Sequence, residues 1–201
     1  MNDVMYRTGR QLTRADILPL EEYVQIRRQR RRQISEIKKH RRLEIGPYAT
    51  FYFENFDTMW QQIQEMLYIE KGGEAQIADE LEAYNPLIPQ GSELVATVMF
   101  EIDDPDRRAR ELMRLGGIEN HAFIELNGER ILGEPDRTRE NTSPEGKASS
   151  VQFLRFPFAA AQVEAFREPG ARVMLGFDHP NYGHLAVLPD PVRAALARDF
   201  D

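Results

Sequence analysis

The spacing of apolar residues changes from a helical period to a strand period near Gly91. Before that point they recur every three or four residues, as in helices that bury one face. The pattern predicts helices over residues 13–43, 58–71 and 74–84, with Thr13 or Asp16 capping the first and Asp57 the second. Between the first two, Gly46–Pro47 breaks the helix and Ala49–Glu54 reads as an aromatic strand.

After Gly91 apolar and polar residues alternate, which is typical of strands with one buried face. Asn127–Gly128 between two alternating segments predicts a two-residue hairpin turn. Further strands are expected over residues 92–103, 149–158, 171–178 and 184–188, with helices over 104–115, 160–168 and 189–200. Short links between about six strands predict an α+β fold with one mainly antiparallel sheet and helices on one face.

The chain of 201 residues fits one domain, residues 13–201, after a loose lead-in over residues 1–12. Only residues 13–45 are a candidate for a separate element. Their apolar stripe is thin and interrupted by basic residues, so we expect a helix that protrudes or lies on the surface as a docking arm. The stripe consists of Leu20, Tyr23, Ile26, Ile34 and Ile37.

The chain contains no cysteine, which excludes disulfides, cysteine nucleophiles and cysteine-ligated iron–sulfur clusters. No apolar run is long enough to span a bilayer, and the N-terminus lacks an apolar stretch of signal-peptide length. We therefore expect a cytoplasmic protein without a membrane span.

Charge is unevenly distributed along the chain. The formal net charge is −7, yet residues 27–42 hold nine Lys or Arg against one Glu. Such a stretch can bind a polyanion such as nucleic acid, or an acidic protein surface. It contains no aromatic residue for base stacking, which favours protein contact, and the acidic third helix is a possible partner within the chain or on a second copy. The proposed contact residues are Arg27, Arg28, Arg30, Arg31, Arg32, Lys38 and Lys39.

The histidines suggest a possible metal site. His179 and His184 flank a Pro-Asn-Tyr-Gly segment, and Glu119 and His121 stand two positions apart. Imidazole and carboxylate groups are common ligands, so one divalent ion on these four side chains is chemically reasonable. The alternative, which we favour, is a hairpin whose turn residues satisfy backbone groups.

Familiar catalytic motifs are missing from the sequence. No Glu is followed three positions later by His, as a carboxylate-bridged di-iron bundle requires. Gly146–Lys147 lacks the earlier glycine of a phosphate-binding loop, because Asn141 stands at that position. Residues 133–148 instead predict a long polar loop whose cations, Arg137, Arg139 and Lys147, could hold an anion.

Several segments together resemble the bacterial domain-of-unknown-function family 3501. They are "LEIGPYATFYFENFDTMWQQIQEMLYIE", "NPLIPQGSELVATVMFEID", "GKASSVQFLRF" and "HPNYGH". The resemblance runs from about Leu12 to the end. It implies a cytoplasmic accessory protein associated with rubrerythrin-like or iron–sulfur redox systems and oxidative stress.

Three hypotheses follow from the sequence. The first is a non-enzymatic accessory protein that binds a redox partner or its own copy through the basic helix. The second is a metal-binding protein or metalloenzyme on His121, His179, His184 and Glu119. The third is nucleic-acid binding through Arg27–Arg42.

Overall fold

The structure is a computed structural model that describes residues 9–201. The helices are α1 (Leu20–Lys39), α2 (Phe56–Glu70), α3 (Gly73–Tyr84), α4 (Pro105–Arg114), α5 (Ala160–Arg167) and α6 (Asp190–Leu196). The strands are β1 (Arg42–Ile45), β2 (Ala49–Phe53), β3 (Glu93–Phe100), β4 (Ala122–Leu126), β5 (Glu129–Leu132), β6 (Glu134–Pro135), β7 (Val151–Pro157), β8 (Val173–His179) and β9 (Tyr182–Val187). Short 3-10 turns are η1 (Arg14–Asp16), η2 (Asn85–Leu87), η3 (Ile118–Asn120) and η4 (Ala197–Asp199).

The strands pair antiparallel, which confirms the predicted α+β class, but they form two sheets rather than one. The five-stranded sheet has the order β1-β2-β3-β7-β6 and the four-stranded sheet has the order β5-β4-β8-β9. The chain passes between the sheets three times: between β3 and β4, between β5 and β6 at Gly133, and between β7 and β8. A Cβ at Gly133 would lie 3.0 Å from Phe156 and 3.2 Å from Ala122, which is closer than ordinary van der Waals contact, so glycine fits this crossing without displacing its neighbours.

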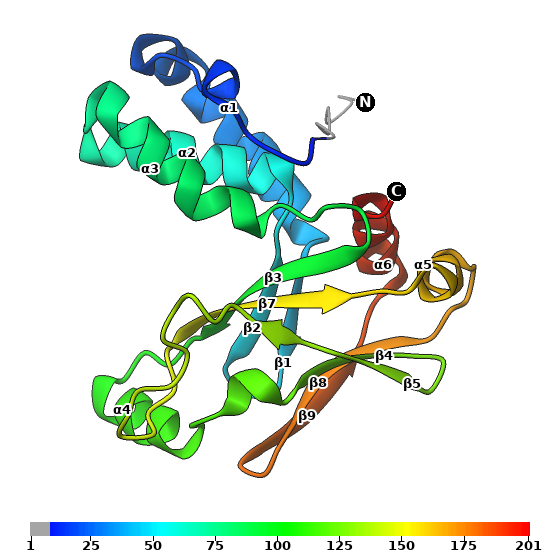
Figure 1. Ribbon diagram of the computed structural model, residues 1–201. Coiled ribbons are helices and arrows are strands. Elements are labelled where there is room, and N and C mark those ends of the chain that lie inside the picture. The colour runs from blue at the N-terminus through cyan, green and yellow to red at the C-terminus, as the bar shows by residue number, and fades with distance from the viewer. Residues whose placement is uncertain (1–8) are drawn as a thin grey trace.

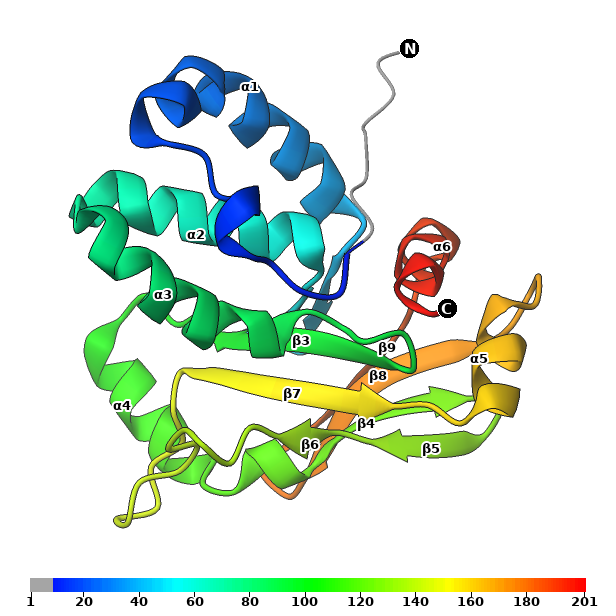
Figure 2. The same ribbon diagram turned by 45° about the horizontal axis from the view of Figure 1, so that its top comes forward.

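The molecule has three layers (Figure 1): helices α1–α3, the five-stranded sheet and the four-stranded sheet. Along β3 the side chains alternate between two cores, as the strand period requires. Leu94, Ala96 and Val98 belong to the larger core, which includes residues of both sheets. Val95 belongs to a second core with Trp60 and other residues of the helical layer. Figure 2 shows the helices covering the outer face of the five-stranded sheet.

Helix α1 lies against the body instead of protruding. Tyr23, Ile34 and Ile37 are buried, and β1, which follows the helix, pairs with β2. The helix begins after Pro19 rather than at Thr13 or Asp16. No described helix is long and apolar enough to cross a membrane.

The beginning of α2 differs from the prediction by two residues. Asn55 is the N-cap, and its side chain accepts from the Thr58 backbone N–H at 3.0 Å. Asp57, the expected cap, is fully buried and pairs with Arg30. Asn and Asp are both common N-cap residues. Here Asn55 caps the helix, whereas Asp57 lies inside the first turn and pairs with Arg30 of α1.

The expected lead-in falls partly outside the described residues, which begin at residue 9. Leu12 is buried in the core of the helical layer. Its backbone exchanges hydrogen bonds with the Asn85 side chain, at 2.7 Å from the N–H and 2.9 Å to the carbonyl. The chain is thus ordered against η2 before the first helix begins.

Two hairpins are built on two-residue turns. Asn127 and Gly128 have φ of 52° and 91°, the left-handed conformations that the predicted turn requires. In the second hairpin His179 pairs with Tyr182, which leaves Pro180–Asn181 as the turn. The histidine-rich segment is therefore a hairpin, as the favoured interpretation of the sequence held.

Tyr182 joins the two sheets at the edge formed by β9 and β1. Its hydroxyl donates to the Ile45 carbonyl at 2.6 Å and accepts from the backbone N–H groups of Tyr48 at 3.2 Å and Ala49 at 3.0 Å. Burial raises the pKa of this phenol, so it stays protonated and able to donate. One side chain thus satisfies three backbone groups of the β1–β2 turn.

The Tyr182→Phe substitution should lower the free energy of unfolding by about 1–3 kcal/mol, because it leaves buried backbone groups without a partner. Urea unfolding measures this loss. Tyr52→Phe is the matched control, since the Tyr52 hydroxyl makes an exposed bond to Glu101 and its loss should change little. Equal effects of the two substitutions would contradict the role assigned to Tyr182.

Candidate functional site

The basic stretch, residues 27–42, contains two kinds of cation. Inward cations pair with carboxylates of the same molecule, and outward cations are exposed to solvent. Arg27 makes two bonds to Glu65 on α2, at 2.9 Å and 2.8 Å, and its guanidinium lies 4.0 Å from the centre of the Tyr68 ring. Arg30 pairs with the buried Asp57 at 3.3 Å and lies over Trp60. These two arginines hold α1 against α2.

Glu65 is the centre of this contact. Burial works to raise its pKa, but hydrogen bonds from Arg27 and Tyr23 outweigh burial and hold the pKa below its ordinary value. Gln61 donates to the Tyr23 hydroxyl at 2.5 Å. Glu65 is therefore an ionised counterion for α1 at neutral pH.

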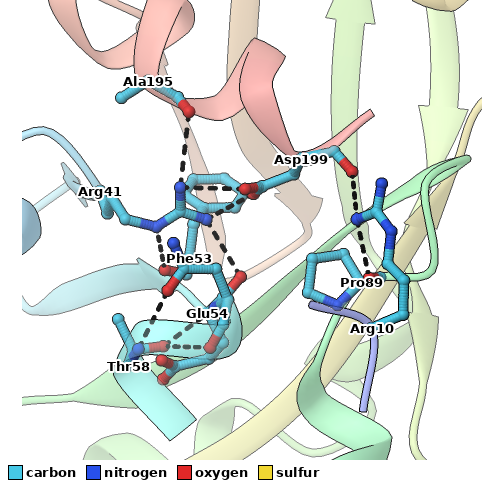
Figure 3. A network of polar contacts seen from close by, with 9 residues as sticks. Arg10, Arg41, Phe53, Glu54, Thr58, Pro89, Ala195 and Asp199 are labelled. Atoms are coloured by element: carbon cyan, nitrogen blue, oxygen red, sulfur yellow. Dashed lines mark hydrogen bonds and ion pairs between the residues drawn. The ribbon is translucent and has the colours of Figure 1, made fainter. Parts of the chain in front are cut away.

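Arg41, at the end of the basic stretch, is buried with 2% exposure (Figure 3). Its guanidinium donates to the carbonyls of Phe53 and Glu54, each at 3.0 Å, and pairs with both carboxylate oxygens of Asp199. It also approaches the Ala195 carbonyl at 3.5 Å. This cation joins the end of β2 to the C-terminal α6–η4 segment.

The outward cations form what we call the arginine face, defined as Arg28, Arg31 and Arg32. All three are exposed. Arg28 and Arg32 make no hydrogen bond or ion pair with any described residue, and Arg31 acts on Glu65 only through longer-range attraction. They line a shallow hollow of about 660 Å³ together with Val24, Arg27, Ser35, Glu36 and Tyr68.

The remaining cations of the stretch differ in their surroundings. Lys39 pairs with Glu36 at 2.7 Å, whereas Lys38 is exposed and has no partner among residues 9–201. The internal acidic partners of α1 lie on α2, not on α3 as the sequence suggested. On α3, Glu74 pairs with Arg14 instead.

The structure brings two of the three loop cations to one place. Arg137 and Arg139 line a cavity of about 1210 Å³ between the end of α3 and the β6 edge. Arg139 lies 4.4 Å from the centre of the Phe153 ring and pairs with Asp136 at 3.4 Å, while Arg137 is exposed and unpaired within the described part. Lys147 is not among the residues that line this cavity. The anion contact stays a prediction, and Arg137 is the loop cation at this cavity without a described partner.

The structure brings two of the four histidines together. The rings of His121 and His179 have centres 5.0 Å apart, and His121 Nδ1 lies 3.1 Å from Asp178. The His184 ring packs instead on Tyr182, with centres 4.6 Å apart. Within residues 9–201 no group of three or more His, Asp or Glu side chains is arranged to hold a metal ion.

Both ring nitrogens of His179 have backbone partners. The Asn181 N–H donates to Nδ1 at 3.2 Å, which assigns the ring proton to Nε2, and Nε2 donates to the Gly116 carbonyl at 3.3 Å. A neutral ring used in this way offers no lone pair to a metal. Glu119 accepts from the Thr142 hydroxyl at 2.9 Å. The metal site remains a prediction of the sequence alone.

The division of the arginines has a signal in the sequence. Positions 23, 27, 30, 34, 37 and 41 recur at steps of four and three, the spacing of one helix face. Arg27 and Arg30 therefore fill the gap in the apolar stripe. A cation on the buried stripe of a helix predicts an acid on its neighbour, and Asp57 and Glu65 supply it.

His179 should make stability depend on pH. Burial lowers its pKa from the ordinary value of 6.5, so its contribution is present above that pH and is lost as the pH falls through the lowered value. We expect His179→Ala to lose about 1–3 kcal/mol at pH 8, through the unpaired Gly116 and Asn181 groups, and to lose this pH dependence. Urea unfolding at several pH values measures both.

The exposed His40 provides the control. His40→Ala should keep the stability and the pH dependence of the parent protein. A parent and a His179→Ala variant with the same pH profile would contradict the assignment.

Comparison with known proteins places the chain in a family. The sequence family described as "Protein of unknown function (DUF3501)" matches residues 11–200. No curated protein matches. A crystal structure described as a novel protein of unknown function from Burkholderia pseudomallei has a TM-score of 0.88 and 38% identity, covering 95% of this chain and 100% of that chain. The chain belongs to the DUF3501 family, as the sequence resemblance predicted.

Proposed function

We propose that this protein is an accessory protein that docks on an acidic surface of a protein partner through the arginine face. The observation that carries the proposal is the contrast within one stretch of chain. Arg27, Arg30 and Arg41 have carboxylate partners inside the molecule, whereas Arg28, Arg31 and Arg32 do not. Arg28 and Arg32 make no ion pair with a described acid, so their guanidinium groups are available to an acidic group of a partner.

The surroundings of the arginine face favour a protein partner. Val24 is 47% exposed and lines the same hollow as the arginines. Apolar side chains beside arginines are typical of protein interfaces, where Arg is enriched. A partner that matches the charge would remove the Val24 side chain from water.

Two features argue against nucleic acid as the partner. The ring that lines the hollow, Tyr68, is covered by the Arg27 guanidinium at 4.0 Å and is not free to stack on a base. The chain as a whole has a formal net charge of −7, which repels a polyanion at long range.

The family resemblance directs the search for the partner to rubrerythrin-like and iron–sulfur redox proteins, and the proposal places the complex in the cytoplasm. A second copy of this chain is the other acidic candidate. Asp79 and Glu82 on α3 are exposed and have no partner among the described residues, so they could meet the arginine face of another molecule.

Charge reversal tests the proposal directly. The triple variant Arg28→Glu, Arg31→Glu and Arg32→Glu should weaken binding at least about tenfold, because each interfacial charge pair becomes repulsive. Calorimetric titration with a purified rubrerythrin-like protein from the same organism measures partner binding. Sedimentation velocity measures self-association of the same samples.

The matched control reverses three exposed arginines elsewhere: Arg107, Arg110 and Arg172. This control changes the net charge by the same amount as the first triple variant, and it should bind the partner as the parent protein does. If both triple variants bind and associate like the parent, the arginine face is not a docking site. Binding of single-stranded RNA that falls steeply with salt and is lost only in the first variant would assign the face to nucleic acid instead.

A further inference from the structure

The hollow at the arginine face is a trough that follows one side of α1. The α1 residues that line it recur at steps of three and one, which is the spacing of a single helix face. They are Val24, Arg27, Arg28, Arg31, Arg32, Ser35 and Glu36. At the rise of an α-helix this stretch is about 18 Å long. The trough therefore has the direction of a helix axis and the length of a short helix.

Contacts inside the molecule fix the walls of the trough. Arg27 is held by two bonds to Glu65 of α2 and lies 4.0 Å from the centre of the Tyr68 ring, which lines the trough from the side of α2. Figure 2 shows α2 between α1 and α3, so α1 is at the outer edge of the helical layer. A rod that lay in the trough would contact α1 along its length and α2 at Tyr68, as a further helix does in a bundle.

The trough is positively charged, and the molecule does not balance this charge from within. Glu36, the acid among its lining residues, pairs with Lys39, and Arg27 pairs with Glu65. The three residues of the arginine face make no ion pair with a described residue. They also repel one another, because like charges three and four positions apart are neighbours on a helix. An occupant of the trough should therefore be acidic.

The chemistry of the trough changes along its length. Val24 lies at the end nearest the start of α1 and is 47% exposed, and the arginine face follows about one and two turns further along. A matching occupant has acids over the arginines and an apolar side chain over Val24. Helix dipoles favour an antiparallel pair, and acids are favoured near the N-terminus of a helix. Both effects place the acids before the apolar residue in the sequence of a helical occupant.

We propose that the docking element of the partner is an α-helix with an acidic stripe, which lies antiparallel to α1 in the trough. Its acids recur at steps of three and four residues, and an apolar residue about one turn later packs on Val24. This inference rests on the proposed docking function and adds the form of the partner. An acidic segment without helical structure could neutralise the arginines but would not require this spacing.

Two peptides of equal composition test the spacing. Each is an N-acetylated Ala–Gln helix of about 18 residues with three Glu and one Leu. The first carries Glu at i, i+3 and i+4 and Leu at i+7, all on one face, and the second carries Glu at i, i+2 and i+5, which spreads the acids around the helix. Circular dichroism checks that both are helical. In fluorescence anisotropy at low ionic strength the first should bind with a Kd on the order of 0.1–1 mM, and the second at least about fivefold more weakly.

Substitutions in the trough should weaken binding of the first peptide without lowering stability. Arg28→Gln removes one charge and relieves its repulsion with the other two arginines, so the melting temperature should stay the same or rise while the affinity falls about threefold. Val24→Ala removes the apolar contact where Ala is the better helix former, so it should act in the same direction. Arg107→Gln, at an exposed position of α4, is the matched control and should bind as the parent protein does.

Equal binding of the two peptides overturns the inference, and so does the absence of binding by either at about 2 mM. Parental affinity in both Arg28→Gln and Val24→Ala does the same, because the peptide would then bind elsewhere. The docking function is judged separately by the triple charge reversal. Loss of the purified partner in that variant, together with equal binding of the two peptides, would keep the arginine face as a docking site and reject the helix.

Discussion

The buried Arg41 guanidinium is the contact on which the arrangement of the layers depends. A cation removed from water destabilises a fold by several kcal/mol unless its donors meet acceptors. Here the carbonyls of Phe53 and Glu54 and the carboxylate of Asp199 provide them. Because these groups belong to the end of β2, the link between β2 and α2 and the C-terminal segment, one side chain fixes three parts of the chain relative to the end of α1. Nearby, Arg10 donates to the Asp199 carbonyl at 2.8 Å, so the beginning and the end of the described chain meet at the same place.

The same reasoning explains the two uses of the basic stretch. Cations on the buried face of α1 need carboxylates within the molecule, and Glu65 and Asp57 on α2 provide them. Cations on the opposite face remain solvated and can serve recognition. The arginine face is held in a fixed orientation because the buried face is anchored by Tyr23, Ile34 and Ile37. The basic segment is thus a structural element of the fold as well as a proposed docking surface.

Local chemistry made much of the fold predictable from the sequence. The Asn127–Gly128 hairpin was predicted because its turn conformation is set by two residues. Strand β1 was missed because Arg42–Ile45 reads as a continuation of the basic helix, and only its pairing with β2 reveals it. The second sheet was missed because the division depends on which strands pair, and β3 pairs with β7 and β4 with β8 across long stretches of sequence. For the candidate site, the sequence identified the basic stretch but not its two faces.

The most direct test of the central claim compares two triple variants that keep every positive charge. One replaces Arg27, Arg30 and Arg41 with Lys, and the other replaces Arg28, Arg31 and Arg32 with Lys. Lysine cannot reproduce the forked geometry of the guanidinium, so the inward set should lose about 3 kcal/mol or more of unfolding free energy. The outward set should change by less than about 0.5 kcal/mol per residue. Equal losses in urea unfolding would show that the inward and outward arginines of the basic stretch do not differ in their structural role and would contradict the account.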